Sequence, residues 1–251
     1  NNGEAVAVSA DGGVIVGKAY NADGNTHAAS WVDGTVTDLG TLGGGTSRAV
    51  AVSADGGVIV GNTFNGDQYA ASWVGGELID LGTLEGGNRS EATIVSADGN
   101  IIVGRARNAF SKYHAVLWVD GSTTATDLGT LGGDSSEAFA VSADGNVVVG
   151  EAQIVGGIFH AALWVDGSTT ATDLGTLGGP FSRAVAVSAD GRVIVGNSLN
   201  ANYNQYAAVW VGGSTAATAL GTLGGTYSNA LAMSADGSVI VGNSLNADNI
   251  G

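Results

Sequence analysis

One ten-residue segment recurs six times almost unchanged, and this repetition constrains the fold more than any other feature. It reads VSADGGVIVG from Val8 and again from Val52. Its aspartate recurs at Asp11, Asp55, Asp98, Asp144, Asp190 and Asp236, at spacings of 44, 43, 46, 46 and 46 residues. One Trp follows each of the first five copies, and LGTL occurs five times. Such periods predict a repeat architecture: one repeat domain over residues 1–251, with five complete units and one half unit of 43–46 residues.

Each unit is expected to hold four short strands, at 5–10, 13–20, 27–32 and 35–42 in the first unit. These segments are alternating or continuously apolar and rich in Val, which is typical of strands. Helices are not expected, because the 43 glycines recur every few residues. Asp11-Gly12 and Asp33-Gly34 lie between consecutive strands. Asp-Gly in that position predicts a two-residue hairpin turn.

Four antiparallel strands in about 45 residues form the unit of a β-propeller blade. The sequence therefore predicts an all-β fold of tandem four-stranded antiparallel repeats arranged as a β-propeller. A parallel β-solenoid with two coils per repeat is the alternative. Its coils would not need hairpin turns at fixed places, so the recurring Asp-Gly pairs favour the propeller.

The amino-acid composition limits the classes of partner that this chain is expected to bind. The net charge is −15, from 23 acidic and 8 basic residues, and so acidic a surface repels nucleic acid and anionic lipid. Apolar runs are too short for a membrane-spanning helix, and we expect no membrane insertion of this segment. Cysteine is absent, which suits an exported chain and excludes disulfides. The chain begins at Asn1 and is interpreted as a mature or excised segment.

Three motifs together resemble a known repeat family. DLGTLGG, the A-x-VSADG-x-VVVG pattern and HAALW are similar to the HAF repeat of bacterial extracellular and surface proteins. The third residue of the naming triplet departs from Phe, since the chain reads HAA at His27 and His160 and HAV at His114. The resemblance covers nearly the whole chain. It implies export, as in autotransporter passenger regions, and a binding or adhesive task, and it carries no catalytic residues.

The repeated polar residues are expected to be structural. Ser and Asp of SADG recur in all six copies, whereas catalysis needs one constellation in one pocket. One further position alternates between His and Tyr, and Tyr cannot replace His as a metal ligand or base: His27, Tyr69, His114, His160 and Tyr206. We therefore predict no catalytic residue, no metal site and no cofactor.

The aspartates before LGTL leave two interpretations open. They are Asp38, Asp80, Asp127 and Asp173, with Ala219 in the fifth copy. They could cap backbone N–H groups in the following turn, or line a channel that holds a cation. A separate position alternates in charge, and there we expect ion pairs between neighbouring units, Glu4 with Arg48 and Glu137 with Arg183.

Recognition is expected where the units differ, in the segment between the second and third strands. The third copy concentrates basic and aromatic residues, which anchor protein interfaces: Arg105, Arg107, Phe110, Lys112 and Tyr113. The fourth copy adds apolar residues: Ile154, Val155, Ile158 and Phe159. These two segments are the predicted partner-binding surface, although ordinary sequence drift in tolerant loops would also produce such variation.

The sequence thus predicts a secreted or surface-displayed bacterial repeat protein that binds a host protein, receptor or glycan without catalysis. A structural spacer without a specific ligand is one alternative. A propeller enzyme acting on glycans is another, and its acid would occur in only one repeat, which makes Glu77, Glu85 and Glu151 the residues to examine.

Overall fold

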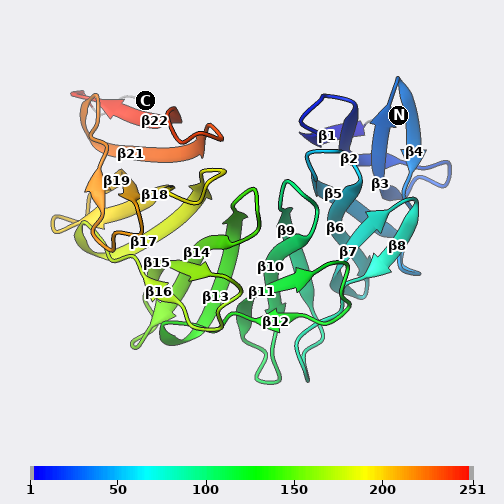
Figure 1. The fold of residues 1–251 in the computed structure, drawn as a ribbon, viewed down its shortest axis with the longest axis horizontal. Helices are drawn as coiled ribbons and strands as arrows, with labels where there is room; N and C mark the ends of the chain where they lie inside the picture. Colours follow the sequence, from blue (N-terminus) through cyan, green and yellow to red (C-terminus); the bar gives the residue numbers. More distant parts are fainter. Residues whose placement is uncertain (1–2, 249–251) are drawn as a thin grey trace. The chain divides into compact units, whose positions relative to one another are not determined.

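A computed structural model describes residues 3–248, and every regular element in that range is a β-strand (Figure 1). The strands form five four-stranded sheets and one two-stranded sheet, and each sheet comes from one repeat unit. Within each sheet the strands are antiparallel and neighbours in sequence. The prediction of tandem four-stranded antiparallel repeats is confirmed, and the parallel solenoid is wrong. We call the sheets blades 1 to 5 and the last pair of strands the terminal hairpin.

The chain divides into two compact units, Asn1–Asp127 and Leu128–Gly251, and each is described by itself. The first unit contains blades 1 to 3. Their strands are β1 (Gly3–Val8), β2 (Val14–Tyr20), β3 (Thr26–Val32), β4 (Thr35–Asp38), β5 (Thr46–Val52), β6 (Val58–Asn65), β7 (Asp67–Val74), β8 (Glu77–Asp80), β9 (Ser90–Val95), β10 (Ile101–Arg107), β11 (Tyr113–Val119) and β12 (Thr126–Asp127).

The second unit contains blades 4 and 5 and the terminal hairpin. Its strands are β13 (Gly132–Val141), β14 (Val147–Ile154), β15 (Phe159–Val165), β16 (Thr172–Asp173), β17 (Gly178–Val187), β18 (Val193–Asn200), β19 (Gln205–Val211), β20 (Thr218–Ala219), β21 (Gly224–Met233) and β22 (Ile240–Asn246).

The fourth strand of each blade is shorter than predicted. In blade 1 it ends at Asp38, so LGTL lies outside the sheet. The reason is local. The carboxylate of Asp38 accepts a hydrogen bond from the Gly40 N–H at 2.8 Å, and Gly40 has a φ of 73°. This left-handed residue turns the chain out of the strand toward the next blade.

The two Asp-Gly pairs of the first repeat make different turns. Asp33 and Gly34 both have positive φ, 49° and 76°, in a two-residue hairpin turn as predicted. The turn at Asp11-Gly12 is longer than predicted, because the Ser9 N–H donates to the Val14 carbonyl and four residues lie between them. There only Gly12 has positive φ, and the Asp11 carboxylate accepts hydrogen bonds from the Ser9 hydroxyl and the Gly13 N–H.

The SADG turn also connects consecutive blades. The Ala10 N–H donates to the Ala54 carbonyl at 2.9 Å, and the Ala54 N–H donates to Ala97 at the same distance. In the second unit Ala143 bonds to Ala189, and Ala189 bonds to Ala235. Each copy of the motif therefore closes a hairpin, and within each compact unit consecutive copies are joined by a backbone hydrogen bond.

Within each of the two compact units, hydrophobic cores lie between successive blades. Between blades 1 and 2, small side chains such as Val16, Ala28 and Ala49 surround Trp73. Between blades 4 and 5, Ala184 and Ile194 pack with Trp210. Alanine and valine dominate because the facing sheets approach closely, and Trp73 and Trp210 fill the remaining space.

Candidate functional site

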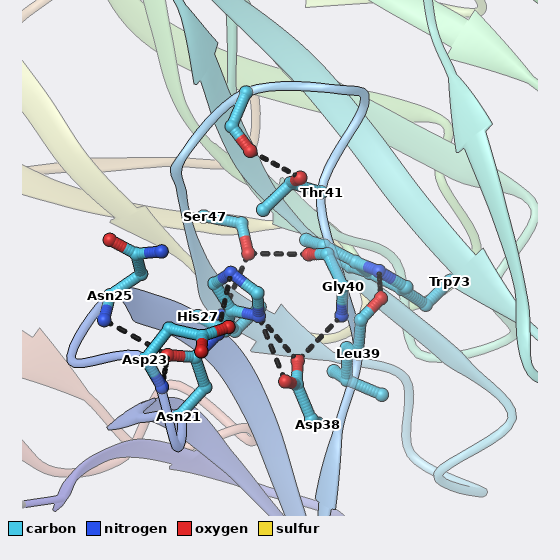
Figure 2. Close-up of polar contacts among 12 residues, drawn as sticks. Asn21, Asp23, Asn25, His27, Asp38, Leu39, Gly40, Thr41, Ser47 and Trp73 are labelled. Atoms are coloured by element: carbon cyan, nitrogen blue, oxygen red, sulfur yellow. Dashed lines mark hydrogen bonds and ion pairs between the residues drawn. The ribbon is translucent and has the colours of Figure 1, made fainter.

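The His of blade 1 is held on both ring nitrogens (Figure 2). His27 on β3 has its Nδ1 2.8 Å and 2.9 Å from the two carboxylate oxygens of Asp38, at the end of β4. The Asn21 amide nitrogen lies 3.4 Å from His27 Nε2. A neutral ring that donates from Nδ1 and accepts at Nε2 satisfies both contacts. This arrangement fixes the imidazole between its neighbours, as predicted for a structural position.

The same pair recurs in two other blades. His114 Nδ1 lies 2.8 Å from Asp127, and His160 Nδ1 lies 2.9 Å from Asp173. The aspartates that precede LGTL also cap the following turn, since the Gly82 N–H donates to Asp80 and the Gly175 N–H donates to Asp173. The capping interpretation is confirmed at these positions. No cluster of three or more His, Asp or Glu side chains suited to a metal occurs within residues 3–248.

The SADG aspartates are also held by neighbours. A hydrogen bond from the Ser hydroxyl, 2.6 Å long in all six copies, is the main reason that the pKa values of these carboxyls lie below the ordinary range. In the last copy, Ser234 and Ser238 lower the pKa of Asp236 to about 2. The Ser oxygen also accepts a backbone N–H, as Ser9 does from Val14. Ser and Asp are thus bonded to each other and to the turn.

Three of the variable segments share one pattern of hydrogen bonds from an Asn side chain to the backbone, which was not predicted from the sequence. Asn108 Oδ1 accepts the N–H groups of Phe110 and Lys112. Asn21 and Asn200 bind the equivalent N–H groups of their own turns. The signal was an Asn-Ala pair at the start of each turn: 21–22, 108–109 and 200–201. These turns therefore present different side chains from one backbone conformation.

The structure brings together part of the predicted basic and aromatic cluster. The guanidinium groups of Arg105 and Arg107 lie 4.7 Å and 5.0 Å from the centre of the Tyr113 ring. Arg105 also forms an ion pair with Glu91 at 2.8 Å. Phe110, at the tip of the β10–β11 turn, is 84% exposed, and Lys112 is also exposed. Arg105, Arg107 and Tyr113 thus lie in contact, and Phe110 is exposed at the tip of the same turn.

The predicted apolar segment of blade 4 lies in the second unit. Ile154 ends β14 and Phe159 begins β15, and both are partly buried. The Ile154 N–H donates to the Ile158 carbonyl at 2.9 Å, which closes a tight turn. Val155 is 80% exposed and Ile158 is 41% exposed. This turn presents two aliphatic side chains to solvent.

The charged residues form ion pairs different from the predicted sets. Glu4 pairs with Lys18 on the neighbouring strand at 2.9 Å, and Arg48 pairs with Glu91 of the next blade. Arg183 binds Glu151 at 2.8 Å. Arg48 and Arg183 thus each reach a carboxylate on a neighbouring blade, and Arg48 does so at Glu91 and not at the predicted Glu4. Of the other non-repeating acids, Glu77 and Glu85 are exposed.

A cavity on blade 1 was not anticipated. Its volume is about 290 Å³, and its lining includes Tyr20, Asn21, His27, Trp31 and Asp38. Trp31 is partly exposed, whereas the other four Trp side chains are at most 2% exposed. Trp31 is the equivalent of Trp73, whose ring packs against residues of the preceding blade.

Comparison with solved structures confirms the fold class. TolB from Acinetobacter baumannii is similar with a TM-score of 0.55 and 14% identity, over 86% of this chain and 53% of TolB. The β-propeller domain of the trilobed protease from Pyrococcus furiosus is similar with a TM-score of 0.56 and 10% identity, over 94% of this chain and 77% of that domain. Puromycin hydrolase is similar with a TM-score of 0.55 and 14% identity, over 83% of this chain and 36% of the hydrolase. The chain thus spans about half of TolB. No protein-family model and no curated protein sequence matches.

Proposed function

We propose that the protein is an exported, non-catalytic binding protein that recognises a host surface protein or receptor through the turns between the second and third strands. The carrying observation is the β10–β11 turn, where Phe110 is 84% exposed on a backbone held by Asn108. A rigid aromatic anchor loses little conformational freedom on binding, and such residues dominate interface energies. Export is supported by the resemblance to extracellular HAF repeats and by the absence of cysteine.

The chemistry around Phe110 indicates the kind of partner. Lys112 follows it on the same turn, and Arg107 and Tyr113 lie at the adjoining strand ends. An aromatic ring beside positive charge fits an apolar pocket bordered by carboxylates. The chain as a whole is strongly acidic, with a net charge of −15, so an acidic partner would be repelled from other surfaces and oriented toward this turn.

The test uses Phe110→Ala and Lys112→Ala, with Asn202→Ala as the matched control. Asn202 occupies the position of Phe110 in the corresponding turn of blade 5, and its N–H binds Asn200 as the Phe110 N–H binds Asn108. Because Phe110 and Lys112 are exposed, neither replacement should lower the melting temperature. Binding of fluorescent protein to intact host cells should fall at least tenfold for Phe110→Ala and remain unchanged for Asn202→Ala.

Treatment of the cells separates the possible partners. Loss of binding after surface proteolysis indicates a protein partner, whereas loss only after glycosidase treatment indicates a glycan. Binding by Phe110→Ala equal to that of the unaltered protein would remove this turn from the interface. No saturable binding at all would favour the structural spacer.

A further inference from the structure

We propose that a second cavity, between blades 2 and 3, binds one small uncharged molecule with an apolar body and a hydroxyl group that pairs with the hydroxyl of Ser72. The inference goes beyond the proposed function, because it assigns a small ligand to residues outside the β10–β11 turn. It rests on the lining of the cavity, on the unpartnered hydroxyl of Ser72, and on one pair of residues that distinguishes blade 2 from the other blades.

The cavity lies between two blades that are consecutive in the first compact unit (Figure 1). Its volume is about 390 Å³, which is within the range of sites for small molecules. Blade 2 contributes Val58, Ser72, Val74 and Ile79 to its lining. The strand register pairs Val58 with Val74 and Ser72 with Ile79, and paired residues point to the same side of a sheet. These four side chains therefore form one wall.

Blade 3 supplies the opposite wall and the rim. Ile102 on β10 lines the cavity and is 2% exposed. The rim comes from two turns of blade 3, which are joined because the Asp120 N–H donates to the Asn100 carbonyl at 2.8 Å. The SADG turns of the two blades are also joined, since the Ala54 N–H donates to the Ala97 carbonyl at 2.9 Å. Backbone hydrogen bonds therefore hold the rim and the two blades in place before a ligand binds.

The hydroxyl of Ser72 is a polar group in an apolar wall. Ser72 is 0% exposed, and its Oγ is buried without a hydrogen-bond partner among residues 3–248. Buried hydroxyls are normally paired, because an unpaired one costs free energy. The side chains of Val74, Ile79 and Ile102 around the cavity are aliphatic and cannot pair with it. Ser72 thus has an unused donor and acceptor on the wall of a cavity.

One pair of residues distinguishes blade 2 from the other blades. Blades 3, 4 and 5 have an aliphatic residue at the position of Ser72, paired with a threonine of the fourth strand: Leu117, Leu163 and Val209. Blade 1 pairs Ser30 with Thr37. Leu163 packs in one core with Ile194 of blade 5, which is the equivalent of Ile102. Of the five blades, blade 2 alone combines a serine on the third strand with an isoleucine on the fourth.

A small alcohol or phenol fits these groups. The valine and isoleucine side chains favour a hydrocarbon body, because removal of apolar surface from water is favourable. A ligand hydroxyl can both donate to and accept from Ser72. An anion is disfavoured, because Asp120 is exposed at the rim and the protein has a net charge of −15. The expected ligands are therefore neutral alcohols and phenols, and carboxylic acids are excluded.

The test titrates the unaltered protein with phenol, cyclohexanol, toluene and benzoate, and follows the backbone amides of Gly99, Asn100 and Gly121 by NMR. These three residues belong to the rim. Phenol or cyclohexanol is expected to shift their signals saturably, and benzoate should bind about tenfold more weakly than phenol. Ser72→Ala should weaken phenol binding about fivefold, because one hydrogen bond is lost. Toluene has no hydroxyl, so its affinity should change by less than about twofold.

Ser72→Leu installs the residue of blades 3 and 4 and should fill the cavity and abolish the binding of phenol and toluene. Ser30→Leu makes the same change in blade 1 and is the matched control, which should bind phenol normally. Phe110→Ala should also bind phenol normally while it fails to bind cells, so the two proposals fail separately.

Three results would overturn the site. The first is the absence of saturable shifts with both alcohols, and the second is equal phenol binding by Ser72→Leu, which would place the alcohol elsewhere and leave the Ser72 hydroxyl to water. The third is an equal loss of phenol and toluene binding in Ser72→Ala. If Ser72→Leu does not fold, the comparison of phenol with toluene in Ser72→Ala decides the question.

Discussion

Trp73 donates its indole N–H to the backbone carbonyl of Leu39 at 2.7 Å and so joins two consecutive blades (Figure 2). Trp164 and Trp210 donate in the same way to Leu128 and Leu174, also at 2.7 Å. The indole N–H of Trp118 is buried without an acceptor. In blades 2, 4 and 5 the Trp therefore both fills the core and makes a polar contact. In blade 3 the buried Trp118 only fills the core.

Replacement of Trp210 by Phe should separate these roles. The ring would still fill the core, but the Leu174 carbonyl would lose its donor, so we expect a loss of about 1–3 kcal/mol in the free energy of unfolding. Trp210→Ala should cost about 3–5 kcal/mol, because it also leaves a cavity. Urea denaturation measures both. Trp118→Phe is the control and should cost less than Trp210→Phe, because the buried Trp118 N–H has no acceptor to lose; an equal loss there would contradict the account.

Ser182→Ala should weaken the contact between blades 4 and 5. The Ser182 hydroxyl accepts the Ala161 N–H at 2.8 Å and donates to the Gly175 carbonyl at 2.6 Å, and the residue is fully buried. Its loss leaves a buried donor and acceptor unsatisfied, and we expect about 1–3 kcal/mol of destabilisation. Hydrogen exchange of the Ala161 amide should accelerate. Ser168→Ala, in an exposed turn, is the control and should change neither quantity.

Gly61→Ala should destabilise blade 2 severely. A Cβ at Gly61 would overlap the backbone of Arg48 and Ala49, where the first strand bulges between Ala49 and Ala51. The strand would have to move, at an expected cost of about 3 kcal/mol. Thermal unfolding measures the effect. Gly45→Ala is the control, because a Cβ there meets nothing. Similar unfolding temperatures for both variants would show that the bulge does not require glycine.

Acid should destabilise the protein through the SADG turns. The pKa values of the six aspartates are lowered in the folded state, chiefly by the Ser hydroxyls. A lowered pKa means that the stabilisation is complete above the unfolded value near 3.8 and is lost as the pH falls through the folded value. For Asp236 this window extends from 3.8 to about 2. The free energy of unfolding should therefore decrease between these pH values.

Ser234→Ala tests the cause of that pH dependence. Removal of the hydroxyl bound to Asp236 at 2.6 Å should raise the pKa of that carboxyl toward 3.8, as followed by NMR titration. The other five aspartates serve as internal controls in the same spectrum. An Asp236 pKa that stays at about 2 would transfer the effect to Ser238, whose N–H and hydroxyl also bind this carboxylate.

The sequence by itself determined the all-β class, the six-fold repetition and the structural role of the SADG residues. These properties depend on short-range patterns: Val-rich runs, Asp-Gly turns and a fixed period. The local hydrogen bonds of Ser9 and Asp11 span only two residues, so a single unit contains the information. The Asn-Ala pair that begins three of the variable turns could also be recognised in the sequence.

Only the tertiary structure decided which residues meet across blades. Arg48 reaches Glu91, 43 positions away, and not the predicted Glu4, because the approach of neighbouring sheets sets side-chain reach and sequence spacing does not. The length of the SADG turn depended on which residues adopt positive φ. The environment of each Trp was also decided by tertiary structure, because Trp73 packs against Val16 and Ala28 of the preceding blade whereas Trp31 lines a cavity.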